Sequence, residues 1–285
     1  MTKAQVAGVA TALVLTVGLA GCGDGGAGER SKGEPSGASA SGAVADAHDR
    51  TAAAETARMT VATRATAGGE AVTAQGAGVI DLEEGDSSMT LSSQGQRIEQ
   101  RVLDGVLYQR PHAAGRDQLP GKKAWMKADL SRLKESGSGG GGAQVSDPAE
   151  PFTYTKSLSG REVTKAGTDT IDGTRTTHYR VTVDVKTLAK GDSAKAAQLR
   201  RQLGTSTVPL DLWLDDKGRL RQETIRLTLR PQAGTAETRR QAVTSTTTLK
   251  FGDFGTEADI DAPPARDTVD MTDKLARSSE PQETA

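Results

Sequence analysis

Alternation of hydrophobic and polar residues runs through much of the chain and predicts a β-rich domain. In the first half, Met59, Val61 and Ala65 alternate with polar or small residues. Further short strands are expected at 77–82, 88–92, 97–103, 106–110 and 125–127, separated by turns that contain glycine. This spacing leaves no room for crossover helices, so we expect an antiparallel meander rather than a parallel sheet.

The second half of the chain repeats the pattern more clearly. Alternating apolar residues stand on a strand near 179–185 and on both sides of the turn at 215–218, and 243–251 gives a final strand. Alternate residues of a strand share one face, which predicts a single apolar face. Its expected members, and the candidate lining of a ligand cavity, are Val181, Val183, Leu210, Leu212, Leu214, Ile225, Leu227 and Leu229.

Two longer helices are the available cover for this face. Residues 43–58 are rich in alanine, with Ser41 as a candidate cap, and residues 187–203 precede Gly204, a typical helix-ending residue. Shorter helices are expected within 129–135 and 148–158. A one-sided apolar sheet must bury that face. Alternation does not distinguish a filled core from an open pocket, so the pattern is consistent with both.

The start of the chain has the features of a lipoprotein signal. A short apolar run from Val6 to Ala20 follows Lys3, and Leu19-Ala20-Gly21-Cys22 places the only cysteine behind small residues. The run is too short to span a bilayer. We expect Cys22 to be the acylated first residue of the mature protein, carrying chains such as palmitate, on the extracytoplasmic face of the cell membrane. The alternative is an ordinary cleaved signal with a coincidental cysteine.

Composition suggests four segments. These are a signal peptide at 1–21, a flexible Gly/Ser/Ala tether at 22–42, a folded domain at 43–264 and a polar tail at 265–285 that is disordered or forms a short helix. Within the domain, residues 136–142 consist of glycine and serine and are expected to form a flexible loop. The single cysteine excludes an internal disulfide, so stability must come from the core.

Charge and motifs limit the possible functions. The net charge is -1 with mixed signs, which argues against nucleic-acid binding. No motif of a hydrolase, nucleotide-binding loop or zinc protease appears, so we expect no catalytic residues, cofactor or metal. We expect His48, His112 and His178 to be surface residues. The acidic residues Asp253, Glu257, Asp259 and Asp261 are expected to be an exposed charge run, with cation binding as the weaker alternative.

Several motifs, in this order, resemble the LppX/LprA/LprF/LprG group of cell-envelope lipoproteins. They are the lipobox, the tether, the Trp125-Met126-Lys127 element, Asp172-Gly173-Thr174, His178-Tyr179-Arg180-Val181, the hairpin from Leu212 to Leu220 and the closing Phe251-Gly252-Asp253-Phe254-Gly255 and Ile260-Asp261-Ala262-Pro263-Pro264. The resemblance implies an α+β fold similar to the carriers LolA and LolB, a curved antiparallel half-barrel sheet with helices on its concave face. It also implies binding or transport of acylated envelope lipids.

Two functions of different class follow. The first is a membrane-anchored, monomeric lipoprotein that binds or carries an acylated lipid in an apolar cavity. The second is a regulatory lipoprotein, similar to RseB, that senses the state of the envelope and binds a partner protein through a sheet edge. A pocket that retains acyl chains favours the first, and a dry core favours the second.

The anchor can be tested by replacing Cys22 with serine. If Cys22 carries the acyl chains, Cys22→Ser releases the protein from membranes or leaves an uncleaved precursor, because the thioether to the lipid cannot form. Membrane fractionation and detergent-phase partitioning measure both results. Unchanged partitioning of the processed variant would contradict the lipoprotein assignment.

Overall fold

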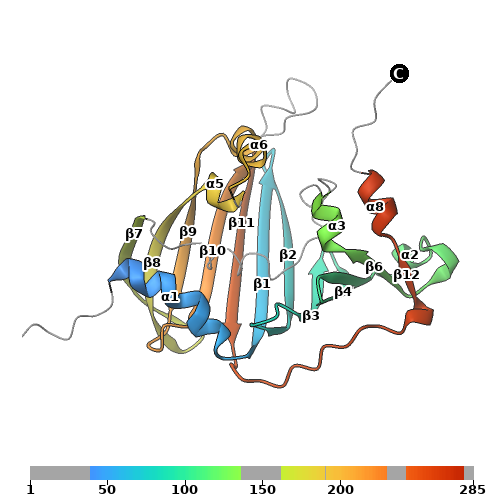
Figure 1. Cartoon of the computed structure of the whole chain (residues 1–285), viewed down its shortest axis with the longest axis horizontal. Coiled ribbons are helices and arrows are strands. Elements are labelled where there is room, and N and C mark those ends of the chain that lie inside the picture. Colours follow the sequence, from blue (N-terminus) through green and yellow to red (C-terminus); the bar gives the residue numbers. More distant parts are fainter. Residues whose placement is uncertain (1–38, 136–161, 190, 230–241, 279–285) are drawn as a thin grey trace, which may run out of the picture. The chain divides into compact units, whose positions relative to one another are not determined.

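The strands of the domain form one large sheet. The computed structural model describes residues 39–135, 162–189, 191–229 and 242–278, which all belong to a compact unit that begins at Ala38. Their twelve strands are arranged in the order β12-β6-β5-β4-β3-β2-β1-β11-β10-β9-β8-β7 (Figure 1). The predicted α+β fold, a curved half-barrel sheet with helices on its concave face, is confirmed. Neighbouring strands are antiparallel except for β12, which runs parallel to β6.

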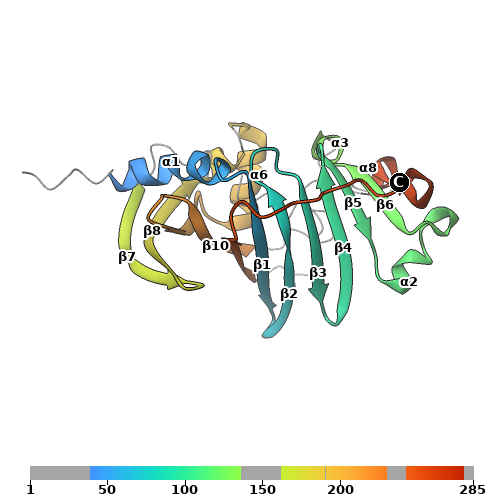
Figure 2. The same cartoon turned by 90° about the horizontal axis from the view of Figure 1, so that it is seen from below.

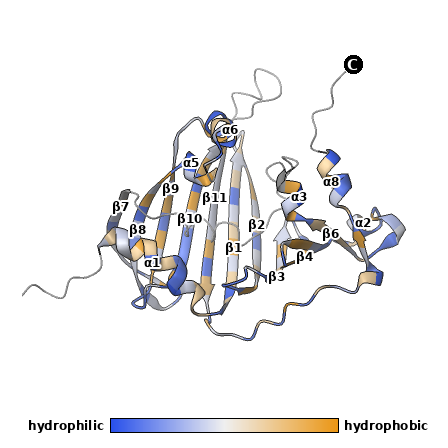
Figure 3. Ribbon diagram, in the orientation of Figure 1, coloured by the Kyte–Doolittle hydropathy of each residue, from blue (hydrophilic) through white to orange (hydrophobic). Residues whose placement is uncertain are grey.

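The sheet consists of two ladders that meet in the middle. The first ladder is β1 (Thr56–Ala67), β2 (Glu70–Asp81), β3 (Ser87–Ser93), β4 (Gln96–Leu103), β5 (Val106–Arg110) and β6 (Trp125–Asp129). The second is β7 (Glu162–Ile171), β8 (Thr174–Asp184), β9 (Thr207–Leu214), β10 (Leu220–Leu229) and β11 (Val243–Gly252). They join where β1 pairs with β11, Arg58 opposite Gly252. The alternation predicted most of these strands, and its hydrophobic and polar bands are visible along them in Figure 3.

The helices differ from expectation at their ends. Helix α1 (Ala40–Ala52) begins earlier than predicted, because the hydroxyl of Ser39 accepts a hydrogen bond from the Gly42 amide at 3.1 Å. It also ends earlier than the predicted residue 58, since β1 already begins at Thr56. The helix expected at 187–203 is two helices, α5 (Val185–Leu188) and α6 (Ser193–Leu203), and Asp192 caps the second. Gly204 ends α6 in the left-handed conformation, as predicted. The remaining short helices are α2 (Ala113–Arg116), η1 (Pro120–Lys122) and α3 (Leu130–Glu135).

The chain after β11 returns to the opposite edge of the sheet. Residues 253–264 cross past β1 to β5 without helix or strand (Figure 2). The Gly255 amide donates to the Thr56 carbonyl at 2.8 Å, and Arg101 donates to the Asp261 carbonyl at 2.6 Å. The segment then forms η3 (Ala265–Asp267), β12 (Thr268–Asp270) and α8 (Thr272–Ser278). Residues 265–278, expected to be a polar tail outside the domain, are therefore part of the sheet edge. The predicted loop at 136–142 and helix at 148–158 lie outside the described residues.

Two glycines allow the sheet to curve between β2 and β3. In Figure 1, β1 and β2 are seen along their length whereas β3 and β4 are foreshortened. A Cβ atom on Gly78 would lie 2.0 Å from the Ser88 carbonyl oxygen, and one on Gly76 would lie 2.4 Å from a methyl of Leu91. Real side chains cannot approach backbone this closely. The strands therefore pack on the concave side at a distance that only glycine permits.

We expect Gly78→Ala to destabilise the domain by roughly 1–3 kcal/mol, because the added methyl forces β2 away from β3. Chemical denaturation measures the loss. Ala71→Gly, at an exposed position of the same strand, is the matched control for the intrinsic difference between glycine and alanine in a strand, which favours alanine. A Gly78→Ala protein as stable as the parent would show that the close approach is not required.

Candidate functional site

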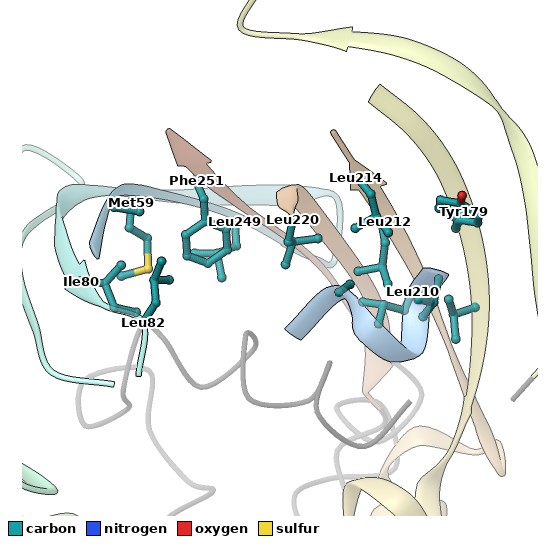
Figure 4. Packing of buried hydrophobic residues seen from close by; sticks show 14 of the residues in the cluster. Met59, Ile80, Leu82, Tyr179, Leu210, Leu212, Leu214, Leu220, Leu249 and Phe251 are labelled. Carbon is teal, nitrogen blue, oxygen red and sulfur yellow. The ribbon is translucent and has the colours of Figure 1, made fainter. Parts of the chain in front are cut away.

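The concave face carries the main apolar cluster of the domain. Of the eight residues predicted to form this face, five are almost completely buried there, with 0–2% of their surface exposed: Val181, Val183, Leu210, Leu212 and Leu214. Met59, Leu249 and Phe251 from the central strands extend the cluster across the sheet (Figure 4). The predicted face therefore exists and continues across β1 and β11.

The other three predicted residues lie farther along β10, where the cover changes. Ile225 is half-buried and touches both this cluster and a second one formed by Val185, Leu203 and Val208 under α5 and α6. Leu227 is half-buried against the second cluster, and Leu229 is 37% exposed. The eight residues thus share one face but not one enclosed space, and their role as cavity lining stays a prediction.

Helix α1 covers the main cluster with small side chains. Its buried residues are Val44, Ala47 and Thr51. The Thr51 hydroxyl donates to the Ala47 carbonyl at 2.6 Å and accepts the Leu220 amide at 2.8 Å, which ties the helix to the start of β10. A single valine and one alanine contribute little apolar area compared with the leucines and aromatic residues beneath them. Helix α1 therefore buries only a small apolar area on this cluster.

One carboxyl group lies inside this apolar face. Glu223 is 1% exposed and stands in register between Leu212 of β9 and Leu249 of β11. Among the described residues neither of its carboxyl oxygens has a hydrogen-bond partner. Burial away from water penalises the charged form and raises the pKa of Glu223 to about 8. At neutral pH the group is therefore mainly a neutral acid.

The sequence contains a signal for the position of this residue. Glu223 has the same parity as Ile225, Leu227 and Leu229, so period-two alternation places it on the apolar face. A bulge at Arg221 then shifts the register, so that Leu220 also faces Leu214 on the concave side. Only the structure shows that the glutamate is fully covered.

The opposite face carries a polar cluster centred on Asp211. His178 Nε2 lies 2.8 Å from one carboxylate oxygen of Asp211, and Arg226 pairs with the other oxygen. The His178 ring stacks on Trp213 at 4.3 Å between centroids, and the Trp213 indole donates to Asp169. Burial raises the pKa of Asp211, but hydrogen bonds from His178 and Arg226 outweigh it and hold the pKa below its ordinary value.

The expectation that His178 and His48 are surface residues is therefore wrong, because their side chains are only 14% and 13% exposed. His178 connects β8 to both neighbouring strands: it pairs with Asp211 and stacks on Trp213 of β9, and lies 3.9 Å from Asp169 of β7. Among the described residues no group of histidine, cysteine, aspartate or glutamate has the arrangement of a metal site. Asp253, from the predicted acidic run, forms an exposed ion pair with Arg58 at 3.2 Å.

A pocket of about 300 Å³ lies over β1 to β4, away from the leucines. Charged and polar side chains contribute to its lining, including Arg58, Glu99 and Arg101. Arg101 is held at its rim by the Asp261 carbonyl and by the Trp125 ring, 5.2 Å away. This pocket does not match the apolar lining expected for acyl chains. In the described part of the chain no helix combines the length and hydropathy of a membrane span.

Comparison with known proteins gives two curated relatives from Streptomyces. An uncharacterized 31.2 kDa protein of Streptomyces griseus is 30% identical over 165 residues, 54% of this chain and 50% of the relative. A lipoprotein candidate of Streptomyces coelicolor is 27% identical over 183 residues, 63% of this chain and 53% of the relative. The chain thus spans about half the length of the curated relatives it matches. No family model matches the chain.

Two solved structures belong to the group that the sequence motifs resemble. LppX of Mycobacterium tuberculosis is 17% identical and covers 77% of this chain and 98% of its own, with a TM-score of 0.45. LprF of Mycobacterium bovis is 14% identical and covers 79% of this chain and 97% of its own, with a TM-score of 0.39. Because these identities and TM-scores are low, a function for this chain has to rest on its own residues.

The buried carboxyl predicts a dependence of stability on pH. The unfolded chain ionises Glu223 near the ordinary pKa of 4.5, whereas the folded protein retains the proton up to about pH 8. The folded state thus binds more protons in this window, and the free energy of unfolding falls as pH rises through it, by up to a few kcal/mol. Denaturation at several pH values measures the slope.

Glu223→Gln keeps the shape of the side chain and should remove this part of the slope, while Glu223→Leu should in addition stabilise the domain near pH 8. The exposed variant Glu84→Gln is the control and should leave the slope nearly unchanged. A parent and a Glu223→Gln protein with the same pH dependence would show that Glu223 finds a partner in solution.

Proposed function

We propose that this protein is a membrane-anchored lipoprotein, attached through Cys22, that binds or carries an acylated lipid against the concave face of its sheet. The observation that carries the proposal is the covering of a broad leucine-rich face by a helix with small buried side chains. An acyl chain that replaces α1 on this face regains the apolar contacts that the helix gives up.

The contacts of α1 support a removable cover. Burying one valine and one alanine contributes only about 2–3 kcal/mol of apolar burial. The hydrogen bond from the Leu220 amide to Thr51 adds about 1 kcal/mol. An acyl chain that leaves the bilayer needs another apolar surface, because exposing it to water costs about 0.8 kcal/mol for each methylene group. The concave face supplies that surface once α1 moves away, and the few contacts of α1 oppose this displacement only weakly.

The far end of the same face gives a route for the chain. Past Ile225 the face becomes progressively more accessible, from half-buried Leu227 to exposed Leu229. Leu227 lies beside Ser245 of β11, whose side chain is small. An acyl chain that enters here would pass Ile225 and its neighbour Leu210 before it reaches Leu212.

Glu223 would give the site one polar group that orients a bound lipid. Ligand pockets are mostly apolar with a few placed polar groups that set orientation. As a neutral acid in the middle of the leucines, Glu223 can donate one hydrogen bond and accept others. A hydroxyl or ester oxygen of a bound lipid can use these positions.

The proposal is tested by filling the entry of the face. Leu227→Trp places a large ring where the chain would pass, at a half-buried position that has room for it, so lipid uptake should fall several-fold with little loss of stability. Thr228→Trp, on the next residue and facing away from the concave side, is the matched control and should bind as the parent does. Uptake of a fluorescent phospholipid and denaturation measure both quantities.

Leu212→Trp complements this test because Leu212 is completely buried. In the closed domain it should overpack the core and cost roughly 1–3 kcal/mol. Native mass spectrometry of the parent protein should detect bound acyl lipid. Absence of lipid from the parent, with equal uptake by Leu227→Trp and Thr228→Trp, would contradict lipid binding and favour a regulatory lipoprotein that binds a partner protein.

A further inference from the structure

Charged residues are segregated between the two ends of the long strands. At one end, β1, β8 and β10 finish and β2, β9 and β11 begin, and α5 and α6 lie there (Figure 1). We call this the α6 end. The other end carries the hairpins between β7 and β8 and between β9 and β10, together with the connections that leave β2 and β11. We call this the acidic end.

The connections at the acidic end contain mainly carboxylates. They are Glu83, Glu84 and Asp86 after β2, Asp172 after β7, Asp215 and Asp216 after β9, and Asp253, Glu257, Asp259 and Asp261 after β11. Lys217 and Arg219 are the cations of these same connections, and Arg219 pairs with Asp215 at 2.8 Å. Two strand cations pair with further carboxylates, Lys250 with Asp172 at 2.9 Å and Arg58 with Asp253 at 3.2 Å, and the other carboxylates keep this end negative. An anionic surface is repelled by this end of the sheet.

The α6 end has the opposite sign. Helices α5 and α6 contribute Lys186, Lys195, Arg200 and Arg201. The carboxylates next to these helices, Asp184 and Asp192, serve as their caps: Asp192 accepts the amides of Ala194 at 2.8 Å and Lys195 at 3.0 Å. Lys186 and Lys195 are exposed. Among the described residues, the other carboxylates of this region are Glu70, at the start of β2, and Glu162, at the start of β7 opposite Thr182.

Exposed apolar side chains are found at the same end. Among the described residues the large hydrophobic side chains with the greatest exposure are Val72, at 44%, and Leu229, at 37%. Val72 pairs with Ala65, Ala65 with Ser245, and Ser245 with Leu227, so Val72 lies on the concave face in the same row as Leu227. Leu229 follows one step nearer the end of the sheet. The open part of the concave face thus reaches the same end of the sheet as these cations.

We propose that the α6 end docks on an anionic lipid bilayer, with Lys186, Lys195, Arg200 and Arg201 at the headgroups and Val72 and Leu229 at the apolar boundary. The acidic end then points away from the membrane. Each cation near an anionic bilayer contributes attraction, and apolar side chains among them add burial at the interface. The docking needs no lipid inside the domain and so extends beyond the proposed function.

The orientation can be measured with a probe at each end of the sheet. Full-length protein with Cys22→Ser receives one new cysteine for a nitrobenzoxadiazole label, either Ala71→Cys at the α6 end or Glu84→Cys at the acidic end, both exposed. Vesicles contain phosphatidylcholine alone or a mixture with phosphatidylglycerol. We expect increased, blue-shifted emission at position 71 with the anionic vesicles only, no change at position 84, and loss of the signal at high salt.

Charge reversal identifies the surface. Lys186→Glu combined with Lys195→Glu should weaken the response at position 71 roughly tenfold or more. Arg175→Glu combined with Lys217→Glu makes the same change of net charge toward the acidic end, at exposed positions, and should leave the response in place. Equal responses at both labels, no preference for anionic vesicles, or an equal effect of the two double variants would overturn the proposal.

A separate measurement distinguishes docking from lipid uptake. After removal of the vesicles, native mass spectrometry of the protein detects any lipid that it has extracted. Docking without extracted lipid supports the orientation proposed here and contradicts the lipid-binding function. Extracted lipid without the response at position 71 supports the function and contradicts the docking surface.

Discussion

The structure depends on how an open sheet with one apolar face keeps that face from water. A closed barrel would bury it on itself, but here the ends of the sheet, β7 and β12, lie at opposite edges. Helices therefore have to cover the apolar face, and the helices of this chain are short and bury small side chains. The leucines of β9 and the aromatic ring of Phe251 are buried under α1, while the far part of β10 is covered incompletely by α5 and α6. Because the helices bury little apolar area, they add little stability and leave the face available to another apolar molecule.

The buried carboxyl groups on the two faces of the sheet differ in the hydrogen-bond donors around them. On the convex face Asp211 is surrounded by donors from His178 and Arg226, so its negative charge is compensated. On the concave face Glu223 has leucines on both sides and no donor within the described residues. The first arrangement fixes the register of three strands. The burial of Glu223 without a donor lowers the stability of the domain. Proteins retain such unfavourable residues mainly at sites that serve a purpose other than folding.

Local patterns predicted the strands and the concave face because both follow from period-two alternation and nearby turns. The division of the helix at 187–203 was missed although Gly191 and the cap Asp192 mark it in the sequence. The C-terminal strand could not be predicted, since residues 253–264 have no periodicity and are held by backbone carbonyls and amides. The pairing of His178 with Asp211 was also missed, because it depends on the register between β8 and β9, which alternation does not determine. Apart from the divided helix, what was missed depends on pairing across the sheet rather than on local sequence.

The position of β11 beside β1 has a consequence for the order in which the chain becomes structured. Arg58 and Gly252 are neighbours in the sheet although most of the sequence separates them, whereas each ladder on either side is built from hairpins of adjacent strands. Contacts between distant residues form slowly, because the intervening chain must first be brought together. The middle of this sheet therefore closes late, because it needs residues near the end of the chain, and the pairing of β12 with β6 needs residues that come later still. A polypeptide with this topology remains without its central strand pair until nearly all of it has been synthesised.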